Sequence, residues 1–120
     1  MVIVTTDSDA YVDVICFDMD GNVIDPTNLN IRVDLKVKDE VFSVEYMPSG
    51  VNENIECVQS EYDGIYCNAL RITITKNTFS EGGVLKISTC EVTPDNNFKE
   101  DNNKEEWTRY ESTNIKYIER

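Results

Sequence analysis

Apolar and polar residues alternate with a period of two along most of this chain. Four apolar residues alternate with four charged ones in Ile31–Lys38, and Leu70–Thr75 and Val84–Thr89 show the same pattern. Because successive side chains of a β-strand point to opposite faces of the sheet, this alternation predicts strands with one buried and one solvated face. The helical repeat is almost absent. The sequence therefore predicts an all-β fold, an antiparallel β-sandwich of about seven or eight strands.

Turn signals at short intervals separate the expected strands. Asp20-Gly21 and Asp63-Gly64 are typical of hairpin turns, and Pro48-Ser49-Gly50 marks another turn. After a short start at the N-terminus, the main strands are expected at Tyr11–Phe17, Ile31–Lys38, Val41–Tyr46, Ile55–Val58, Ile65–Cys67, Leu70–Thr75 and Val84–Val92.

The composition changes at Thr93-Pro94, which divides the domain into three parts. Residues 1–93 are expected to form the sandwich body. Residues 94–106 are expected to form a polar, mobile loop, because one apolar residue in the twelve of Asp95–Glu106 cannot offset the entropy of ordering the segment. Residues 107–120 regain apolar content and are expected to form a final strand or a docking arm of the same domain.

The net charge of −12, from 23 acidic and 11 basic residues, bears on partners. Nucleic-acid binding depends on neutralising phosphates with Lys and Arg, so we expect no nucleic-acid partner and no anionic membrane partner. A solvated acidic surface explains the charge, and an acidic DNA-mimicking inhibitor is the alternative. The N-terminus has neither the basic segment nor the apolar run of a signal peptide, which predicts synthesis in a cytoplasm.

The four cysteines, Cys16, Cys57, Cys67 and Cys90, have no short paired spacing, and the chain has no His. Zinc sites usually combine close Cys pairs with His, so we expect no metal site and no cofactor. The cysteines are expected to be reduced and at least partly buried, acting as small apolar residues.

One motif suggests catalysis. The apolar run ending at Phe17, followed by Asp18-Met19-Asp20-Gly21-Asn22, resembles the first motif of haloacid-dehalogenase phosphatases. In that resemblance Asp18 is the nucleophile and Asp20 the general acid/base. That family needs a parallel sheet with crossover helices, and no helical periodicity follows Asp25. We interpret the motif as a hairpin turn in which Gly21 adopts a positive φ, and we expect no catalytic residues and no enzyme activity.

From Val41 to the C-terminus the chain resembles small β-sandwich domains in virion proteins of gut tailed phages, including crAss-like phages. These domains are similar in style to the N-terminal anchoring domain of lactococcal-phage baseplate upper proteins. The residues that carry the resemblance are Phe42–Tyr46, Tyr62–Gly64, Leu70–Ile74, Phe79, Gly83–Ile87, Thr93–Asp95, Phe98 and Ile115–Ile118.

The resemblance implies a structural protein on the virion surface whose partners are phage capsid or tail proteins and further copies of itself. In many such proteins a receptor-binding or enzymatic part follows, whereas this chain ends at Arg120. We therefore expect an auxiliary capsid, decoration or head-fibre subunit that acts through protein–protein contacts. A carbohydrate- or receptor-binding module is the alternative, and its aromatic platform would come from Tyr46, Tyr62, Tyr66 and Trp107.

The partner contact is expected in the C-terminal segment, because aromatic residues dominate interface energetics and this segment is rich in them. Removing it should abolish assembly and leave a folded sandwich, whereas unfolding would make the segment a core strand. The alternative is that these side chains only cover a sandwich edge. The candidate interface residues are Trp107, Tyr110, Ile115, Tyr117 and Ile118.

Overall fold

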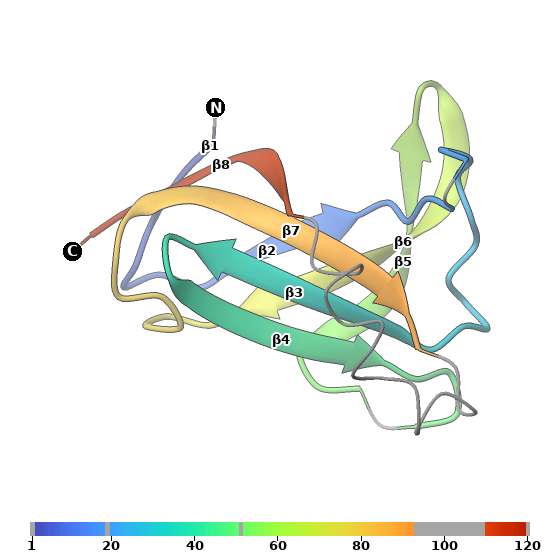
Figure 1. The fold of residues 1–120 in the computed structure, drawn as a ribbon, viewed down its shortest axis with the longest axis horizontal. Helices are drawn as coiled ribbons and strands as arrows, with labels where there is room; N and C mark the ends of the chain where they lie inside the picture. Colours follow the sequence, from blue (N-terminus) through green and yellow to red (C-terminus); the bar gives the residue numbers. More distant parts are fainter. Residues whose placement is uncertain (1, 19, 51, 93–109, 120) are drawn as a thin grey trace.

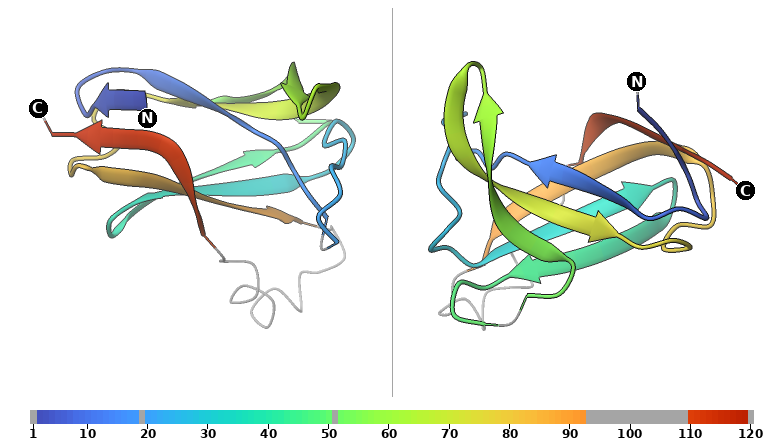
Figure 2. Two further views of the ribbon diagram at one scale, coloured as in Figure 1. Left: turned by 90° about the horizontal axis from the view of Figure 1, so that it is seen from above. Right: turned by 180° about the vertical axis from the view of Figure 1, so that it is seen from behind.

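The computed structural model describes residues 2–18, 20–50, 52–92 and 110–119. Over this part of the chain the secondary structure consists of strands and turns, with no helix, which confirms the predicted all-β class. Two sheets face each other as separate layers (Figures 1 and 2). The strands are β1 (Val2–Thr5), β2 (Ala10–Val14), β3 (Ile31–Val37), β4 (Glu40–Tyr46), β5 (Ile55–Tyr62), β6 (Ile65–Ile74), β7 (Gly83–Glu91) and β8 (Glu111–Ile118).

The strand order within the two sheets is that of an immunoglobulin-type sandwich. The larger sheet has the order β1-β8-β7-β3-β4 and the smaller has the order β2-β6-β5. In the usual lettering, β2, β6 and β5 take the places of strands B, E and D, and β8, β7 and β3 those of G, F and C. All neighbouring strands are antiparallel except β1 and β8, which run parallel. This order brings the β2–β3 connection and the β5–β6 turn to the same end of the sandwich.

The core lies between the two sheets and follows the alternation in the sequence. On β3, Val33, Leu35 and Val37 are fully buried, and on β6 Leu70 and Ile72 face them from the opposite layer. Fully burying one such side chain contributes about 1.5–3 kcal/mol, so this layer supplies most of the driving force for folding.

The long β6 strand differs from the prediction of two short strands, Ile65–Cys67 and Leu70–Thr75. The polar residue between them, Asn68, suggested a break. Its side-chain amide instead donates to the Asp25 carboxylate and the Thr27 hydroxyl, both at 3.1 Å, so the strand runs on through it. A polar residue inside a strand is tolerated when its hydrogen bonds are made within the protein.

The C-terminal segment forms an inner strand. β8 lies between β1 and β7 and pairs with both, and the Tyr117 side chain is only 2% exposed. Of the two alternatives for this segment, strand and docking arm, the strand is correct for residues 111–118. The predicted mobile loop at 94–106 and Trp107 lie outside the described residues.

Candidate functional site

The β5–β6 hairpin projects beyond the rest of the small sheet (Figure 1). β6 pairs with β2 only from Leu70 to Ile74, so its first five residues and the facing part of β5 extend past the end of β2. The hairpin closes at Asp63 (φ 54°) and Gly64 (φ 79°). Two successive positive φ angles define a type I′ turn, whose twist matches that of the flanking strands, and this confirms the predicted Asp-Gly turn.

Large apolar side chains are exposed at this projecting end. Five of these side chains, whose exposed fractions run from 40% to 73%, form a group that we call the apolar tip. Phe17 pairs with Val23 across an isolated bridge, and its ring meets the Tyr62 ring edge-on at 5.3 Å. Tyr62 in turn faces Ile65 across the hairpin. Phe17, Tyr62 and Ile65 therefore form one exposed apolar patch, and such a patch on a folded protein marks an interaction surface. Tyr66 follows Ile65 on β6 and points to the opposite face of the hairpin. The residues of the apolar tip are Phe17, Val23, Tyr62, Ile65 and Tyr66.

The turn that begins at Asp18 connects Phe17 to Val23, two residues of the apolar tip. One Asp18 carboxylate oxygen accepts hydrogen bonds from the backbone N–H groups of Asp20 and Asn22, both at 2.9 Å, and Gly21 has φ 85°. The predicted hairpin turn is therefore confirmed. These hydrogen bonds, first of all the one from the Asn22 backbone, hold the pKa of Asp18 below its usual value. The carboxylate proposed as a nucleophile in the phosphatase resemblance serves as the acceptor of its own turn.

Asp25 fixes the rest of the β2–β3 connection. Its carboxylate accepts from the Thr27 backbone N–H at 3.0 Å, from the Thr27 hydroxyl and from the Asn68 amide. The Tyr46 hydroxyl donates to the Thr27 carbonyl at 3.1 Å, which adds a link to β4. These hydrogen bonds, with the Thr27 hydroxyl as the largest cause, lower the pKa of Asp25. Hydrogen bonds thus link the β2–β3 connection to both sheets. This connection also carries Phe17 and Val23 of the apolar tip, so the base of the tip is fixed.

The four predicted interface residues that the structure describes do not form one surface. Tyr117 points into the core, where its ring meets Phe79 edge-on at 5.4 Å, and Ile115 packs against the same core. Tyr110 and Ile118 stand at opposite ends of β8, on the order of 27 Å apart at the rise of a strand. Tyr110 lies under the Lys36 ammonium, 5.2 Å from its ring centre.

The structure describes three residues of the predicted aromatic platform, and only two of them are exposed. Tyr46 is buried and bonded to Thr27, whereas Tyr62 and Tyr66 are exposed in the apolar tip. Sequence reasoning missed Phe17, Val23 and Ile65. The signal that could have found Ile65 is its place directly after the Asp-Gly turn, where an apolar residue leaves the sandwich. Phe17 and Val23 carried no such signal, because their burial depended on how the β2–β3 connection folds back.

The cysteines and acidic residues offer little chemistry. All four cysteines are free thiols and at least partly buried, as predicted, and burial raises the pKa of Cys16 to about 11. Within the described ranges no group of three or more Cys, Asp or Glu side chains could hold a metal ion.

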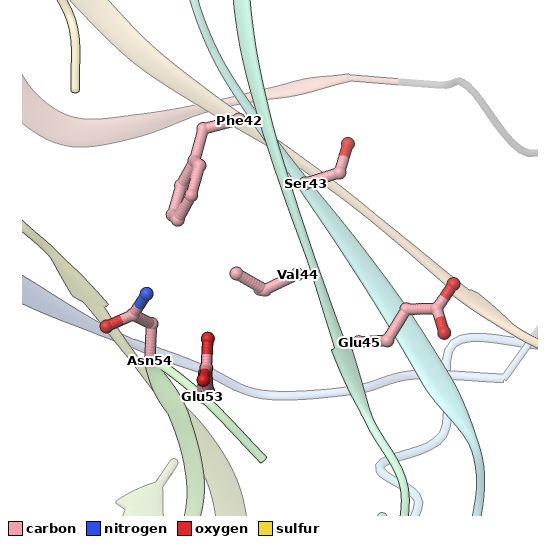
Figure 3. A pocket seen from close by; sticks show the side chains of 6 residues that line it. All are labelled: Phe42, Ser43, Val44, Glu45, Glu53 and Asn54. Carbon is pink, nitrogen blue, oxygen red and sulfur yellow. The ribbon is translucent and has the colours of Figure 1, made fainter. Parts of the chain in front are cut away.

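An open groove of about 460 Å³ runs along β4 (Figure 3); it is lined by Phe42, Ser43, Val44, Glu45, Glu53 and Asn54.

Comparison with known proteins found no protein-family model, curated protein or solved structure that matches this chain. In the part of the chain that the structure describes, no helix is long and apolar enough to span a membrane. The site must therefore be interpreted from its own geometry.

Proposed function

We propose that this domain is a structural protein that acts through protein–protein contacts, with the apolar tip as its main contact surface. One observation carries the proposal: five large apolar side chains stay 40–73% exposed on a base fixed by internal hydrogen bonds. Burying each of them on a partner would contribute up to about 1.5–3 kcal/mol. Because the base is already ordered, little further entropy is lost on binding.

The family resemblance supplies the setting for this contact. A structural virion protein of a tailed phage, such as an auxiliary capsid, decoration or head-fibre subunit, works through surface area and symmetry rather than through a catalytic centre. The sandwich fold fits this role, and its capsid or tail partner would receive the apolar tip. The acidic surface keeps such a protein soluble before assembly.

Quantitative mass spectrometry of purified virions from the source of this sequence tests the setting. The proposal expects peptides of this chain in a fixed stoichiometric ratio to the major capsid protein, retained through density-gradient purification. Recovery of the chain only in the soluble fraction of infected cells would overturn the virion role.

Exposed tyrosine rings favour a second candidate function, binding of a carbohydrate or receptor. Tyr66 is 73% exposed and Tyr62 is 47% exposed, and both belong to the projecting hairpin. Aromatic rings of this kind can provide flat apolar surface at low entropic cost. A glycan array probed with the protein and with Tyr66→Ser separates the two functions. Glycan binding that is lost in Tyr66→Ser supports this candidate, and no binding by the unaltered protein rejects the carbohydrate form of it.

A further inference from the structure

The free edge of β4 has the features of a strand-pairing surface. β4 is the last strand of the larger sheet and pairs with β3 through all seven of its residues without a bulge. Its other edge carries no strand among the described residues, and the open groove of Figure 3 lies beside it. Natural edge strands are usually protected by charged side chains, by Pro or by a bulge. β4 has no Pro and no bulge, and its charged residues are Glu40, whose carboxylate accepts from the Ser80 and Glu81 N–H groups, and Glu45.

The register identifies which backbone groups face this free edge. The Val92 N–H donates to the Asn30 carbonyl at 2.8 Å, just beyond the paired residues of β3 and β7. Hydrogen-bonded and non-bonded pairs alternate in antiparallel sheets, so the even residues of β3 bond to β7 and the odd ones to β4. The two-residue turn at Lys38-Asp39 gives the same phase. The backbone groups that remain for a new strand are those of Val41, Ser43 and Glu45.

We propose that a second copy of this chain pairs with β4 in antiparallel orientation, with the two-fold axis at Ser43. This register pairs all seven residues of β4 with a copy of the same strand and extends the larger sheet of each copy into one continuous sheet. Ser43 then faces Ser43 of the partner subunit, and each of these residues donates its N–H to the carbonyl of the other. This interface is separate from the apolar tip and shares no residue with it.

Side chains across this two-fold axis are compatible on both faces of the sheet. On the core face Phe42 would lie opposite the partner's Val44, an apolar pair that closes the groove. On the outer face Val41 would lie opposite the partner's Glu45, so no two like charges are directly opposed. Symmetric registers in which Glu45 faces its own copy place two carboxylates together, which is destabilising.

Nearby basic side chains favour this register as well. Arg32 lies opposite Glu45 within one chain, and Lys36 lies opposite Val41. In the continuous sheet, Glu45 would therefore have its own Arg32 on one side. On its other side would come Val41 of the partner subunit and, one strand further, Lys36 of the partner subunit. The net charge of −12 acts against association over longer distances, and salt screens this repulsion. We expect the dimer to become tighter as ionic strength rises.

Sedimentation equilibrium of the full chain from micromolar to millimolar concentration tests the proposal. The apparent mass should rise from 13.7 kDa toward twice that value. Ser43→Pro removes the central edge N–H of both copies, which should weaken dimerisation by roughly tenfold or more because two hydrogen bonds are lost. Pro is tolerated at edge positions whose N–H faces solvent, so this variant should fold. A chain that stays monomeric over the whole range overturns the proposal.

Matched variants separate the β4 edge from other surfaces. Ser43→Ala keeps the N–H and loses the hydroxyl that donates to Asp34 at 2.6 Å, so it should still form the dimer. Gln59→Pro removes an outward N–H from the free edge of the smaller sheet, because the odd residues of β5 face away from β6. It should also dimerise as the unaltered chain does. Loss of the dimer in Gln59→Pro but not in Ser43→Pro would move the interface to β5 and overturn the assignment.

A charge series at Val41 gives an answer even if Ser43→Pro fails to fold. Val41 is 53% exposed, so Val41→Glu and Val41→Lys should both fold. Val41→Glu faces the partner's Glu45 and should weaken the dimer, whereas Val41→Lys should strengthen it. Thr73→Glu and Thr73→Lys make the same charge changes on the exposed face of β6 and serve as the control. Equal effects at the two positions would show that net charge alone is responsible and would overturn the register.

Discussion

Single residues in this protein show how burial and hydrogen bonding decide what a side chain can do. Tyr117 was expected at a partner interface because of its aromatic ring, yet the ring fills the core beside Phe79. Its hydroxyl is buried without a hydrogen-bond partner among the described residues, and burial raises its pKa. A buried, unpaired hydroxyl costs free energy, so the ring stabilises the fold and the oxygen does not.

The ring and the hydroxyl of Tyr117 should therefore affect the free energy of unfolding differently. Tyr117→Phe should leave the free energy of unfolding unchanged or raise it, because only the unpaired hydroxyl is removed. Tyr117→Ala should lower it by about 3–5 kcal/mol, the usual cost of deleting a buried aromatic ring. Urea unfolding followed by circular dichroism measures both. A large loss in Tyr117→Phe would show that the hydroxyl has a partner that this account lacks.

Carboxylates that accept backbone hydrogen bonds make the stability of the fold depend on pH. The pKa values of Asp18 and Asp25 are lowered by such bonds, and that of Glu40 is lowered by the N–H groups of Glu81 and Ser80. A carboxylate whose pKa is lower in the folded state stabilises the fold above its unfolded pKa, and this contribution is lost as the pH falls.

Stability should accordingly be constant near neutral pH and fall as the pH drops through about 4 and below. Asp25→Asn removes one of the titrating groups and should make the decline shallower. Urea midpoints measured from neutral to acidic pH check this, with Asp7→Asn, an exposed Asp outside the β2–β3 connection, as the control. A midpoint that rises on acidification would contradict the assigned directions.

At the scale of elements, alternation in the sequence was enough to predict most strands and their buried faces. β3, β4 and β7 begin and end within one or two residues of the expected positions, because each has a regular apolar face. The merger of two predicted strands into β6 could not be foreseen, since it depends on Asn68 finding Asp25 and Thr27 from a distant loop. The role of β8 also depended on tertiary pairing: alternation at Ile115 and Tyr117 fits a strand, but only the topology places it inside a sheet.

The position of β8 reverses the expected result of a C-terminal truncation. Deleting residues 111–120 removes the strand that joins β1 to β7, and with it the Tyr117 ring that packs against Phe79 in the core. We expect loss of cooperative unfolding and loss of near-ultraviolet circular dichroism, rather than a folded sandwich that fails to assemble. A truncated chain that unfolds cooperatively at the same urea concentration as the full chain would contradict the assigned pairing.

The whole molecule combines a rigid sandwich with an exposed apolar end. The β2–β3 connection and the β5–β6 hairpin converge there, and the Phe17 and Tyr62 rings join them. The candidate site was only half predictable: Tyr62 and Tyr66 could be recognised as aromatic candidates, whereas the contact of Tyr62 with Phe17 depends on the way two distant loops meet. Exposed side chains contribute little to stability, so the apolar tip can be altered without unfolding the protein.

A binding measurement on purified virions tests the apolar tip most directly. The triple variant Phe17→Ser, Tyr62→Ser and Ile65→Ser removes its central side chains. The control triple variant Val2→Ser, Ile3→Ser and Ile118→Ser removes three exposed apolar side chains of β1 and β8. In the virion setting proposed above, co-sedimentation with virions stripped of the chain compares both variants with the unaltered protein. We predict that the tip variant loses at least about 90% of binding and that the control retains it, since a few central residues carry most of an interface's energy. Full binding by the tip variant, with or without binding by the control, would contradict the account.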